Sequence, residues 1–356
     1  MLVVCAPDKL RGALDAQAAA AALARGARRS GAETCELPLG DGGEGTLDAL
    51  VASGHARVEH VTVRDPLRRP VSARLGLLGD GSFLVEAAEA VGHARLAAGE
   101  RDPLGATSAG VGDLLRAALD RGAQRVLVAL GGTVTVDGGI GLLGALGALP
   151  DDQAGRSLLI DPTPRRDGLD PRLAGVELVA LHDVDVPLSG PDGAARLFGP
   201  QKGLRAADVP VIDDALARLG ARLGPGIAEH PGAGAAGGLG AALYWLGASG
   251  ESGAEAVAAI VGLAAALQGA SVCLTAEGAV DRQSAHGKTV AAVARACARA
   301  DVTCYVLGGR IDPEGGALLE MLGTRVIALG PPERPLAAAL AAAAADLERI
   351  AAELTA

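Results

Sequence analysis

Aromatic residues are nearly missing from this chain of 356 residues, which holds two phenylalanines, two tyrosines and one tryptophan. Hydrophobic residues nevertheless make up 49% of the sequence, so we expect cores of alanine, valine, leucine and isoleucine packed at close range. Such interiors favour helices that lie tightly on a sheet. Because the chain exceeds the roughly 250–300 residues at which one core stops growing, two domains are expected.

Features that define several other protein classes are also lacking. The net charge is −10 and no run of Lys or Arg occurs, which argues against nucleic acid as a partner. The longest apolar stretch, near Ala337–Ala345, is well short of the roughly 20 residues that cross a bilayer, and the N-terminus does not resemble a signal peptide. The five cysteines show no CxxC spacing, so neither a disulfide framework nor a zinc site is indicated. We therefore expect a cytoplasmic protein without a membrane partner.

Runs of β-branched residues lead into Gly/Asp turns and then into Ala/Leu stretches of helical period, which predicts an α/β fold with a mostly parallel sheet. The expected strands are Leu2–Ala6, Cys35–Leu39, Arg125–Leu130, Val176–Leu181, Ser271–Thr275, Thr303–Leu307 and Arg325–Ala328. The expected helices are Asp15–Arg29, Thr46–Ser53, Ala109–Arg121, Ala207–Arg222, Ala254–Gln268, Thr289–Ala300 and Leu336–Glu353.

Two stretches are plausible domain boundaries, the Pro/Arg-rich segment Arg64–Pro70 and the region Gln268–Val272. We expect residues 1–65 and 271–356 to form one discontinuous, doubly wound domain with a mostly parallel sheet. Residues 66–270 would form an inserted α/β domain. Ligands would then be held in the cleft between the two domains.

Charged residues follow several of the expected strands, where open parallel sheets bind their ligands. They are Asp8, Lys9, Arg11, Asp41, Glu44, Asp137, Asp183, Asp185, Glu277, Asp281 and Lys288. In GGTVTVDGG, the hydroxyls of Thr133 and Thr135 and free backbone N–H groups could hold phosphate oxygens beside Asp137. Phosphoryl transfer needs such carboxylates, cations and N–H groups. Glycine and aspartate are common in tight turns, so any one of these segments can be explained by turn formation alone. Five such turns, each after an expected strand, favour a functional site.

Two familiar phosphate motifs are set aside. A Walker A loop ending at Gly287-Lys288-Thr289 would need glycine at position 282, which is Arg282. The segment GAGAAG at 232–237 follows no strand, so the dinucleotide fingerprint lacks its context, although this loop could still meet a phosphate. An NAD-linked dehydrogenase would need a glycine fingerprint after the first strand, and PDK is not one.

The order of these turns resembles type-1 glycerate kinases from end to end. The segments that carry the resemblance are APDKLRG, PLGDGGEGT, DPLRRPV, VEAAEAVG, ERDPLGATSAGVGDLL, GGTVTVDGG, DVDVPLSGPDGAARLFGPQKG, GAGAAGGLGAAL and TAEGAVDRQSAHGK. The resemblance implies a kinase with a discontinuous Rossmann- or flavodoxin-like domain and an inserted α/β domain. It also implies ATP and Mg²⁺ as cofactors, and D-glycerate as the small hydroxy acid, typically phosphorylated at its 2-hydroxyl to 2-phosphoglycerate.

The resemblance places a set of residues at the site, and their individual roles are hypotheses. The catalytic candidates are Asp8, Arg11, Asp41, Asp183 and Lys202; the substrate-binding candidates are Arg101, Thr133 and Thr135. The nucleotide or phosphate candidates are Gly131, Gly132, Asp137, Gly138, Glu277, Asp281 and Lys288, of which Asp281 and Asp137 would support Mg²⁺. In this hypothesis Asp183 or Asp41 orients or deprotonates the acceptor hydroxyl. The guanidinium groups of Arg11 and Arg101 and the ammonium of Lys202 hold the carboxylate and the phosphoryl group.

The chain also departs from the family pattern. Where the family reads GGSATNDGG, DVDNPL and TGEGRxD, this chain has Val136, Val186 and Ala279, so two amides and a guanidinium are lost. Each lost hydrogen bond is worth roughly 0.5–3 kcal/mol. Either the acceptor differs from glycerate, or the chain is a catalytically silent paralogue that acts as a binding or regulatory protein. The oligomeric state, monomer or homodimer, stays open.

Overall fold

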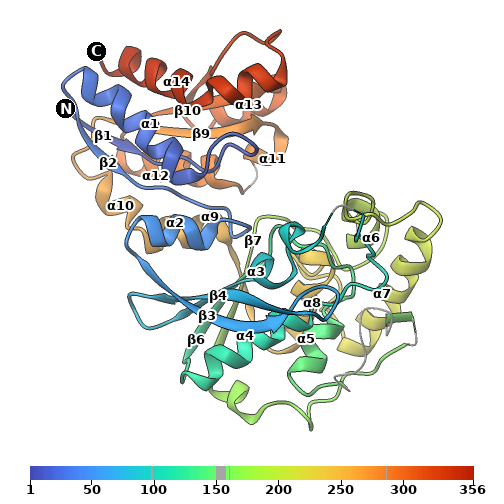
Figure 1. Cartoon of the computed structure of the whole chain (residues 1–356). Coiled ribbons are helices and arrows are strands. Elements are labelled where there is room, and N and C mark those ends of the chain that lie inside the picture. Colours follow the sequence, from blue (N-terminus) through green and yellow to red (C-terminus); the bar gives the residue numbers. More distant parts are fainter. Residues whose placement is uncertain (98, 150–157, 160, 286) are drawn as a thin grey trace. The chain divides into compact units, whose positions relative to one another are not determined.

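The computed structural model of the chain describes residues 1–97, 99–149, 158–159, 161–285 and 287–356. Its fold is mixed α/β with two sheets (Figure 1). The chain divides into two compact units. The first unit comprises Met1–Asp41, Gly45–His55 and Ser252–Ala356, and the second comprises Gly42–Glu44 and Ala56–Glu251.

These boundaries differ from the expected ones at 65/66 and 270/271. The segment Arg64–Pro70 is not a linker but the turn between two paired strands of the second unit, closed by a 2.8 Å hydrogen bond from Asp65 N to the Arg69 carbonyl. Residues 253–266 form two helices that pack on a helix of the first unit. The proline and arginine residues of this tight turn therefore give it a composition similar to that of an interdomain linker.

The first unit has a five-stranded sheet in the order β11-β10-β9-β1-β2, with every pair parallel. Its strands are β1 (Leu2–Cys5), β2 (Glu33–Glu36), β9 (Val272–Val280), β10 (Thr303–Ile311) and β11 (Thr324–Ala328). Its helices are α1 (Ala16–Arg29), α2 (Thr46–Ala52), α9 (Gly253–Ile260), α10 (Leu263–Ala266), α11 (Arg282–Ala285), α12 (Thr289–Ala300), α13 (Pro313–Glu320) and α14 (Leu336–Thr355). Read from β2, the order is that of a flavodoxin-like sheet, whose switch point lies between β1 and its neighbour β9.

Helices cover both faces of this sheet. One core joins α1 and α14 to β1 and β9, and a second core joins α12 and α13 to β9 and β10. Small residues permit close contact, because a Cβ atom on Gly26 of α1 would lie 2.1 Å from the Glu348 carbonyl oxygen of α14. The expected helix Ala254–Gln268 is split into α9 and α10 at Gly262, whose φ is +72°. Asp15 caps α1 by accepting a 2.7 Å hydrogen bond from Ala18 N.

The second unit has a six-stranded sheet in the order β3-β4-β5-β6-β7-β8. Its strands are β3 (Ala56–Arg64), β4 (Pro70–Leu78), β5 (Phe83–Glu86), β6 (Arg125–Ala129), β7 (Glu177–His182) and β8 (Ser249–Ser252). Its α-helices are α3 (Ala87–Val91), α4 (Ala109–Asp120), α5 (Ile140–Ala145), α6 (Ala194–Phe198), α7 (Val209–Leu223) and α8 (Leu239–Trp245). The pairs β5–β6 and β6–β7 are parallel, whereas β3–β4 and β4–β5 are antiparallel.

One large apolar core fills the second unit and joins β4–β7 to α4, α5, α7 and α8. The chain's single tryptophan, Trp245, lies in this core and is 5% exposed. The Arg166 guanidinium lies 4.5 Å from the centroid of its ring and donates a 2.6 Å hydrogen bond to the Trp245 carbonyl. Across the described ranges, no helix combines the length and apolar character needed to span a membrane.

Candidate active site

Asp8 lies at the switch point of the first unit's sheet. It lies three residues beyond the end of β1, and its backbone N–H donates a 3.2 Å hydrogen bond to the Ala276 carbonyl of β9. The next residue of β9 is Glu277. Because open parallel sheets bind ligands outside the carboxyl ends of strands at such a switch point, these two carboxylates occupy the position that the fold favours for a ligand.

The Asp8 carboxylate is held on both of its oxygens and is 7% exposed. Its Oδ1 accepts a 2.6 Å hydrogen bond from Lys9 N, and its Oδ2 accepts a 2.8 Å bond from the Thr289 hydroxyl. Thr289 is the first residue of α12, and the sequence analysis did not assign it to the site. The Gly-Lys-Thr segment at a helix start was the available signal.

Asp8 titrates closer to neutrality than an ordinary aspartate. Burial, with the nearby negative charge of Asp41, raises the pKa of Asp8 to about 6, although Lys9 and the Thr289 hydrogen bond oppose this shift. Lys9 Nζ lies 3.6 Å from Asp41 Oδ1. A carboxylate whose pKa approaches the working pH is suited to accept a proton from a substrate hydroxyl.

Glu277, Asp281 and Lys288, which the sequence analysis proposed for nucleotide binding, lie together in the first unit. Lys288 Nζ is 3.2 Å from Glu277 Oε1 and 3.8 Å from Asp281 Oδ1. Burial raises the pKa of Glu277, and the charge of Lys288 opposes it. Asp281 Oδ1 accepts a hydrogen bond from Ser284 N, which fixes the turn that leads to Lys288. The cluster offers one cation and two carboxylates.

Arg11 and Asp41 belong to the same unit but are less enclosed. The Arg11 side chain is exposed, and the Asp41 side chain is 28% exposed. Gly40 lies so close to Thr46 that a Cβ atom at Gly40 would sit 2.9 Å from Thr46 Oγ1. Thr46 is fully buried at the start of α2. The glycine-rich loop is therefore shaped partly by packing.

In the second unit, the turn GGTVTVDGG follows β6 and carries six of the predicted site residues. Free N–H groups were expected here from the sequence, but several of them are paired in the structure. Gly131 N donates to the Gly42 carbonyl at 3.3 Å, Val134 N to Val91 at 3.0 Å, and Gly138 N to Gly237 at 3.0 Å. The partners come from three distant segments, so the turn is fastened to its surroundings rather than open along its length.

Asp137 is fully buried, and its carboxylate organises the backbone around it. Its Oδ2 accepts hydrogen bonds from Ser108 N (2.8 Å), Ser108 Oγ (2.8 Å) and Gly141 N (3.1 Å), and its Oδ1 accepts one from Gly139 N (3.1 Å). Burial raises the pKa of Asp137 and these hydrogen bonds lower it. This enclosed environment differs from the expected Mg²⁺ contact and favours a structural role.

We expect Ser108→Ala to destabilise the protein by about 1–3 kcal/mol, because it removes a buried group that satisfies two partners. Ser108 Oγ donates to Asp137 and accepts a 3.0 Å hydrogen bond from Leu142 N. Urea denaturation followed by far-UV circular dichroism measures the change. The exposed Ser249 provides the control, since Ser249→Ala should change the free energy of unfolding by less than about 0.5 kcal/mol. Equal stability of the two variants would contradict this role of Ser108.

Lys202 is buried against the same turn and brings three predicted residues together. Its Nζ donates to Thr133 Oγ1 at 3.2 Å and to the Thr135 carbonyl at 2.8 Å. The side chain is 4% exposed, and burial lowers the pKa of Lys202 to about 7, with the Asp137 carboxylate acting in the opposite direction. The Thr135 hydroxyl is buried without a hydrogen-bond partner in the described part of the chain. This region therefore combines a lysine that titrates near neutrality with an unused buried hydroxyl.

Asp183 and Arg101 approach this region from other segments of the second unit. Asp183 follows β7 directly and is half-buried. Arg101 is exposed, and a Cβ atom at Gly203 would lie 3.4 Å from Arg101 Cβ, which places Arg101 beside the residue after Lys202. His182 is the last residue of β7. A 2.7 Å hydrogen bond joins its Nε2 and the Tyr244 hydroxyl.

The segment 232–237, considered as a phosphate loop, packs its glycines against backbone. A Cβ atom at Gly237 would lie 2.0 Å from the Thr135 carbonyl oxygen, and one at Gly234 would lie 2.3 Å from the Pro187 carbonyl oxygen. These glycines are therefore required for close packing against the turn and against the loop that follows β7. Among the described residues, no group of three or more His, Cys, Asp or Glu side chains is arranged to hold a metal ion.

The comparison with known proteins decides the family. The model of the glycerate kinase family matches residues 3–356. The chain belongs to the glycerate kinase family. It is 37% identical to the glycerate kinase of Bacillus subtilis (strain 168), covering 100% of this chain and 97% of that protein. It is 36% identical to the glycerate 2-kinase of Escherichia coli (strain K12), covering 89% of this chain and 87% of that protein.

This member of the glycerate kinase family is also similar to a glycerate kinase of known structure. The crystal structure assigned to glycerate kinase 2 of Salmonella typhimurium LT2 is 35% identical and superposes with a TM-score of 0.83. The match covers 100% of this chain and 97% of that one. The resemblance to glycerate kinases and the α/β fold with mostly parallel sheets are thus confirmed, and the chain is a kinase.

Proposed function

We propose that this kinase transfers the γ-phosphoryl group of ATP to a hydroxyl of D-glycerate or a closely related hydroxy acid, with 2-phosphoglycerate as the expected product. One observation carries the proposal beyond family membership. Asp8, with a pKa of about 6, lies at the switch point of the first unit's sheet beside Glu277. That position and that pKa suit a group that takes a proton from the acceptor.

In this proposal Asp8, rather than Asp183 or Asp41, is the base. The acceptor oxygen forms a bond to the γ-phosphorus, its proton passes to the Asp8 carboxylate, and the bond between the phosphorus and the ADP oxygen breaks. Asp41 assists through its charge, which contributes to the raised pKa of Asp8. Arg11, which is exposed in the same unit as Asp8, is available to bind the acceptor carboxylate, since a guanidinium group matches a carboxylate geometrically.

The remaining predicted residues fall into two sets. Glu277, Asp281 and Lys288 are proposed to bind the nucleotide phosphates, and the 48% exposed carboxylate of Asp281 fits a Mg²⁺ ion, which usually binds one or two carboxylates together with phosphates. When bound, Mg²⁺ would neutralise phosphate charge. Lys202 and the buried Asp137 are proposed to position the turn that carries Thr133 and Thr135.

The three positions that depart from the family pattern do not have the same environment. Val136 is 2% exposed within the core of the second unit, Val186 is half-buried and Ala279 is exposed. Val136 therefore has a packing role in this chain, and its presence alone does not indicate a silent paralogue. Of the three substitutions, those at Val186 and Ala279 remain as candidates for a change in how the acceptor is bound.

We expect ADP release to depend on D-glycerate, with a kcat in the usual range of 1–100 s⁻¹ for kinases. A coupled ADP-release assay with D-glycerate, L-glycerate and related hydroxy acids, each with and without Mg²⁺, measures this. Val186→Asn is the informative variant, because Val186 is half-buried in the loop that follows β7 and the change restores the amide of the family pattern. A raised activity with glycerate in that variant would indicate a shifted acceptor. No turnover with any acid, together with no thermal protection by Mg-ATP, would contradict the proposal.

A further inference from the structure

The strands β9 and β10 continue beyond the carboxyl edge of the first unit's sheet. The register of β1 with β9 ends at Leu274, and that of β11 with β10 ends at Gly308. The β9–β10 pair goes further, and Arg310 lies opposite Ala279. These strand ends form the β9–β10 extension, residues 278–280 and 309–311. The extension lies past the carboxyl ends of the neighbouring strands, which is where an open parallel sheet binds its ligands.

The backbone of the β9–β10 extension is held by two neighbouring segments of the same unit. A Cβ atom at Gly278 would lie 3.3 Å from Arg11 N, so the extension contacts the loop that carries Arg11. Asp312 N, at the start of α13, donates a 2.9 Å hydrogen bond to the Val280 carbonyl. Arg310 is therefore presented from a fixed strand rather than from an open loop.

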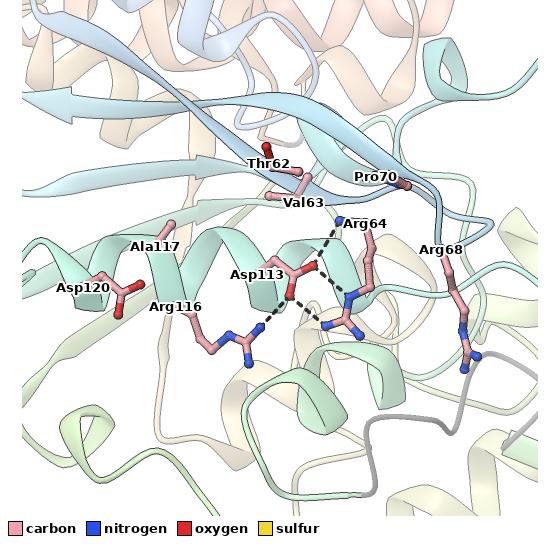
Figure 2. Close-up of a pocket in the computed structure, with 9 residues that line it drawn as sticks. All are labelled: Thr62, Val63, Arg64, Arg68, Pro70, Asp113, Arg116, Ala117 and Asp120. Atoms are coloured by element: carbon pink, nitrogen blue, oxygen red, sulfur yellow. Dashed lines mark hydrogen bonds and ion pairs between the residues drawn. The ribbon is translucent and has the colours of Figure 1, made fainter.

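The Arg310 side chain has no partner in the described part of the protein. Several arginines elsewhere are held by carboxylates. At the β3–β4 turn, for example, Asp113 accepts hydrogen bonds from Arg64 Nη2 (2.7 Å) and Arg116 Nη2 (3.1 Å) (Figure 2). Arg310 is exposed, and its guanidinium group makes no hydrogen bond or ion pair with any described residue. Its five N–H donors are available to a ligand.

Arg310 lies beside the position at which this chain has lost a guanidinium group. Where the family reads TGEGRxD, this chain has Ala279. Opposite residues of a parallel pair have side chains on the same face, and the strands lie about 4.8 Å apart. Ala279 is exposed and has only a methyl group, so the longer Arg310 side chain can extend over it. The chain thus lacks an arginine at position 279 and has one on the adjacent strand.

The surroundings of Ala279 favour a phosphate ligand for Arg310. Ala279 lies midway in the sequence between Glu277 and Asp281, and both carboxylates are near Lys288 Nζ, at 3.2 and 3.8 Å. The charge of Lys288 is therefore shared with two carboxylates, whereas Arg310 is unpaired among the described residues. A guanidinium group matches two oxygens of a phosphate group at once.

We propose that Arg310 binds the phosphate groups of the nucleotide and replaces the arginine that the family pattern has at position 279. This assignment rests on the proposed function, since Glu277, Asp281 and Lys288 are the residues proposed to bind the same phosphates. It adds a phosphate-binding residue that lies outside every motif of the family resemblance.

Binding of inorganic tripolyphosphate with Mg²⁺, measured by isothermal titration calorimetry, tests the contact without turnover. Arg310→Gln removes the charge, and we expect the Kd to rise about tenfold or more, as for the loss of a hydrogen bond to a charged group. The melting temperature should stay within about 2 °C, because the side chain is exposed. Mg-ATP should lose affinity by a similar factor, since the phosphates make the contact.

Arg299→Gln is the matched control. Arg299 is an exposed arginine in the last turn of α12, roughly 16 Å along the helix axis from Lys288. This variant should leave the Kd for tripolyphosphate within about twofold of the parent, because surface charges at that distance are largely screened. Equal Kd values for Arg310→Gln and Arg299→Gln would overturn the proposal.

Moving the guanidinium group back to β9 gives a second test. Ala279→Arg, added to Arg310→Gln, should regain at least about fivefold of the lost affinity for tripolyphosphate, because a forked donor again faces the phosphates. Ala300→Arg, added to the same background, is the control of equal net charge, since Ala300 is exposed at the end of α12. Equal recovery in the two double variants would overturn a specific contact at this position.

Steady-state kinetics separates the nucleotide from the acceptor. In the ADP-release assay, Arg310→Gln should raise the KM for ATP about tenfold and change the KM for glycerate less than about twofold, because the lost contact is to the nucleotide. A raised KM for glycerate with an unchanged KM for ATP would overturn the assignment to the nucleotide. If the parent turns over no hydroxy acid, the proposed function fails, while the calorimetric comparison still decides whether Arg310 binds phosphates.

Discussion

Replacement of Asp8 by Asn is expected to lower kcat with glycerate by about 10²–10⁴-fold, the usual contribution of a positioned proton acceptor. The variant keeps the size of the side chain and an oxygen that can accept from Lys9 N or Thr289, but it cannot take a proton. The ADP-release assay measures the loss. In the intact enzyme, kcat/KM should fall as the pH drops below about 6, where Asp8 gains its proton.

The stability of the Asp8 variant shows whether the loss is catalytic. The pKa of Asp8 is 3.8 when unperturbed and about 6 in the folded chain, so ionised Asp8 opposes folding, and this cost grows between pH 3.8 and 6 and is complete above 6. Asp8→Asn should therefore be at least as stable as the parent at pH 7. Asp41→Asn removes a neighbouring charge and should shift the acid limb of kcat/KM to lower pH. Activity of Asp8→Asn within threefold of the parent would exclude Asp8 as the base.

Replacement of Lys202 by Met is expected to lower kcat/KM by roughly 10²-fold or more, because a small misplacement of positioning groups has effects of this size. Without the Nζ atom, the Thr133 hydroxyl and the Thr135 carbonyl lose the donor that fixes them. Methionine fills a similar apolar volume, so the core of the second unit should remain packed. The same ADP-release assay provides the measurement.

The pH dependence of stability distinguishes this role from damage to the fold. The pKa of Lys202 falls from 10.5 to about 7 on burial, so the unfolded chain holds a proton that the folded chain releases between these pH values. The resulting cost to folding is complete below pH 7 and disappears as the pH rises toward 10.5. The stability of Lys202→Met relative to the parent should therefore improve as the pH is lowered from about 9.5 to 6.5. A difference that does not change with pH would contradict a buried, titrating lysine.

The sequence predicts the elements of the first unit well, because its parallel strands are short runs of buried residues that end in Gly/Asp turns. The strands β1, β9 and β10 and the helix α12 lie where their patterns place them. The antiparallel hairpin β3–β4 was missed, since its exposed positions dilute the apolar alternation and its turn contains proline and arginine. Composition alone does not distinguish such a turn from a linker.

Individual site residues could be predicted only as a set. The charged turns predict that Asp8, Glu277 and Lys288 lie near a ligand, because strand ends converge in a parallel sheet. Burial, however, depends on partners from distant segments. Asp137 looks like a metal ligand in the sequence, yet Ser108 and two glycine N–H groups enclose it. The near-neutral pKa of Lys202 likewise arises from packing that no local pattern reveals.

The single tryptophan has a practical consequence for studies of unfolding. Trp245 is enclosed in the second unit's core beneath Arg166, and the first unit contains none. Intrinsic fluorescence excited at the red edge of tryptophan absorption therefore follows the loss of structure in one half of the chain, while the backbone signal in the far ultraviolet follows both. Denaturation curves that coincide by the two probes would indicate one cooperative transition, and curves that separate would give each half its own stability.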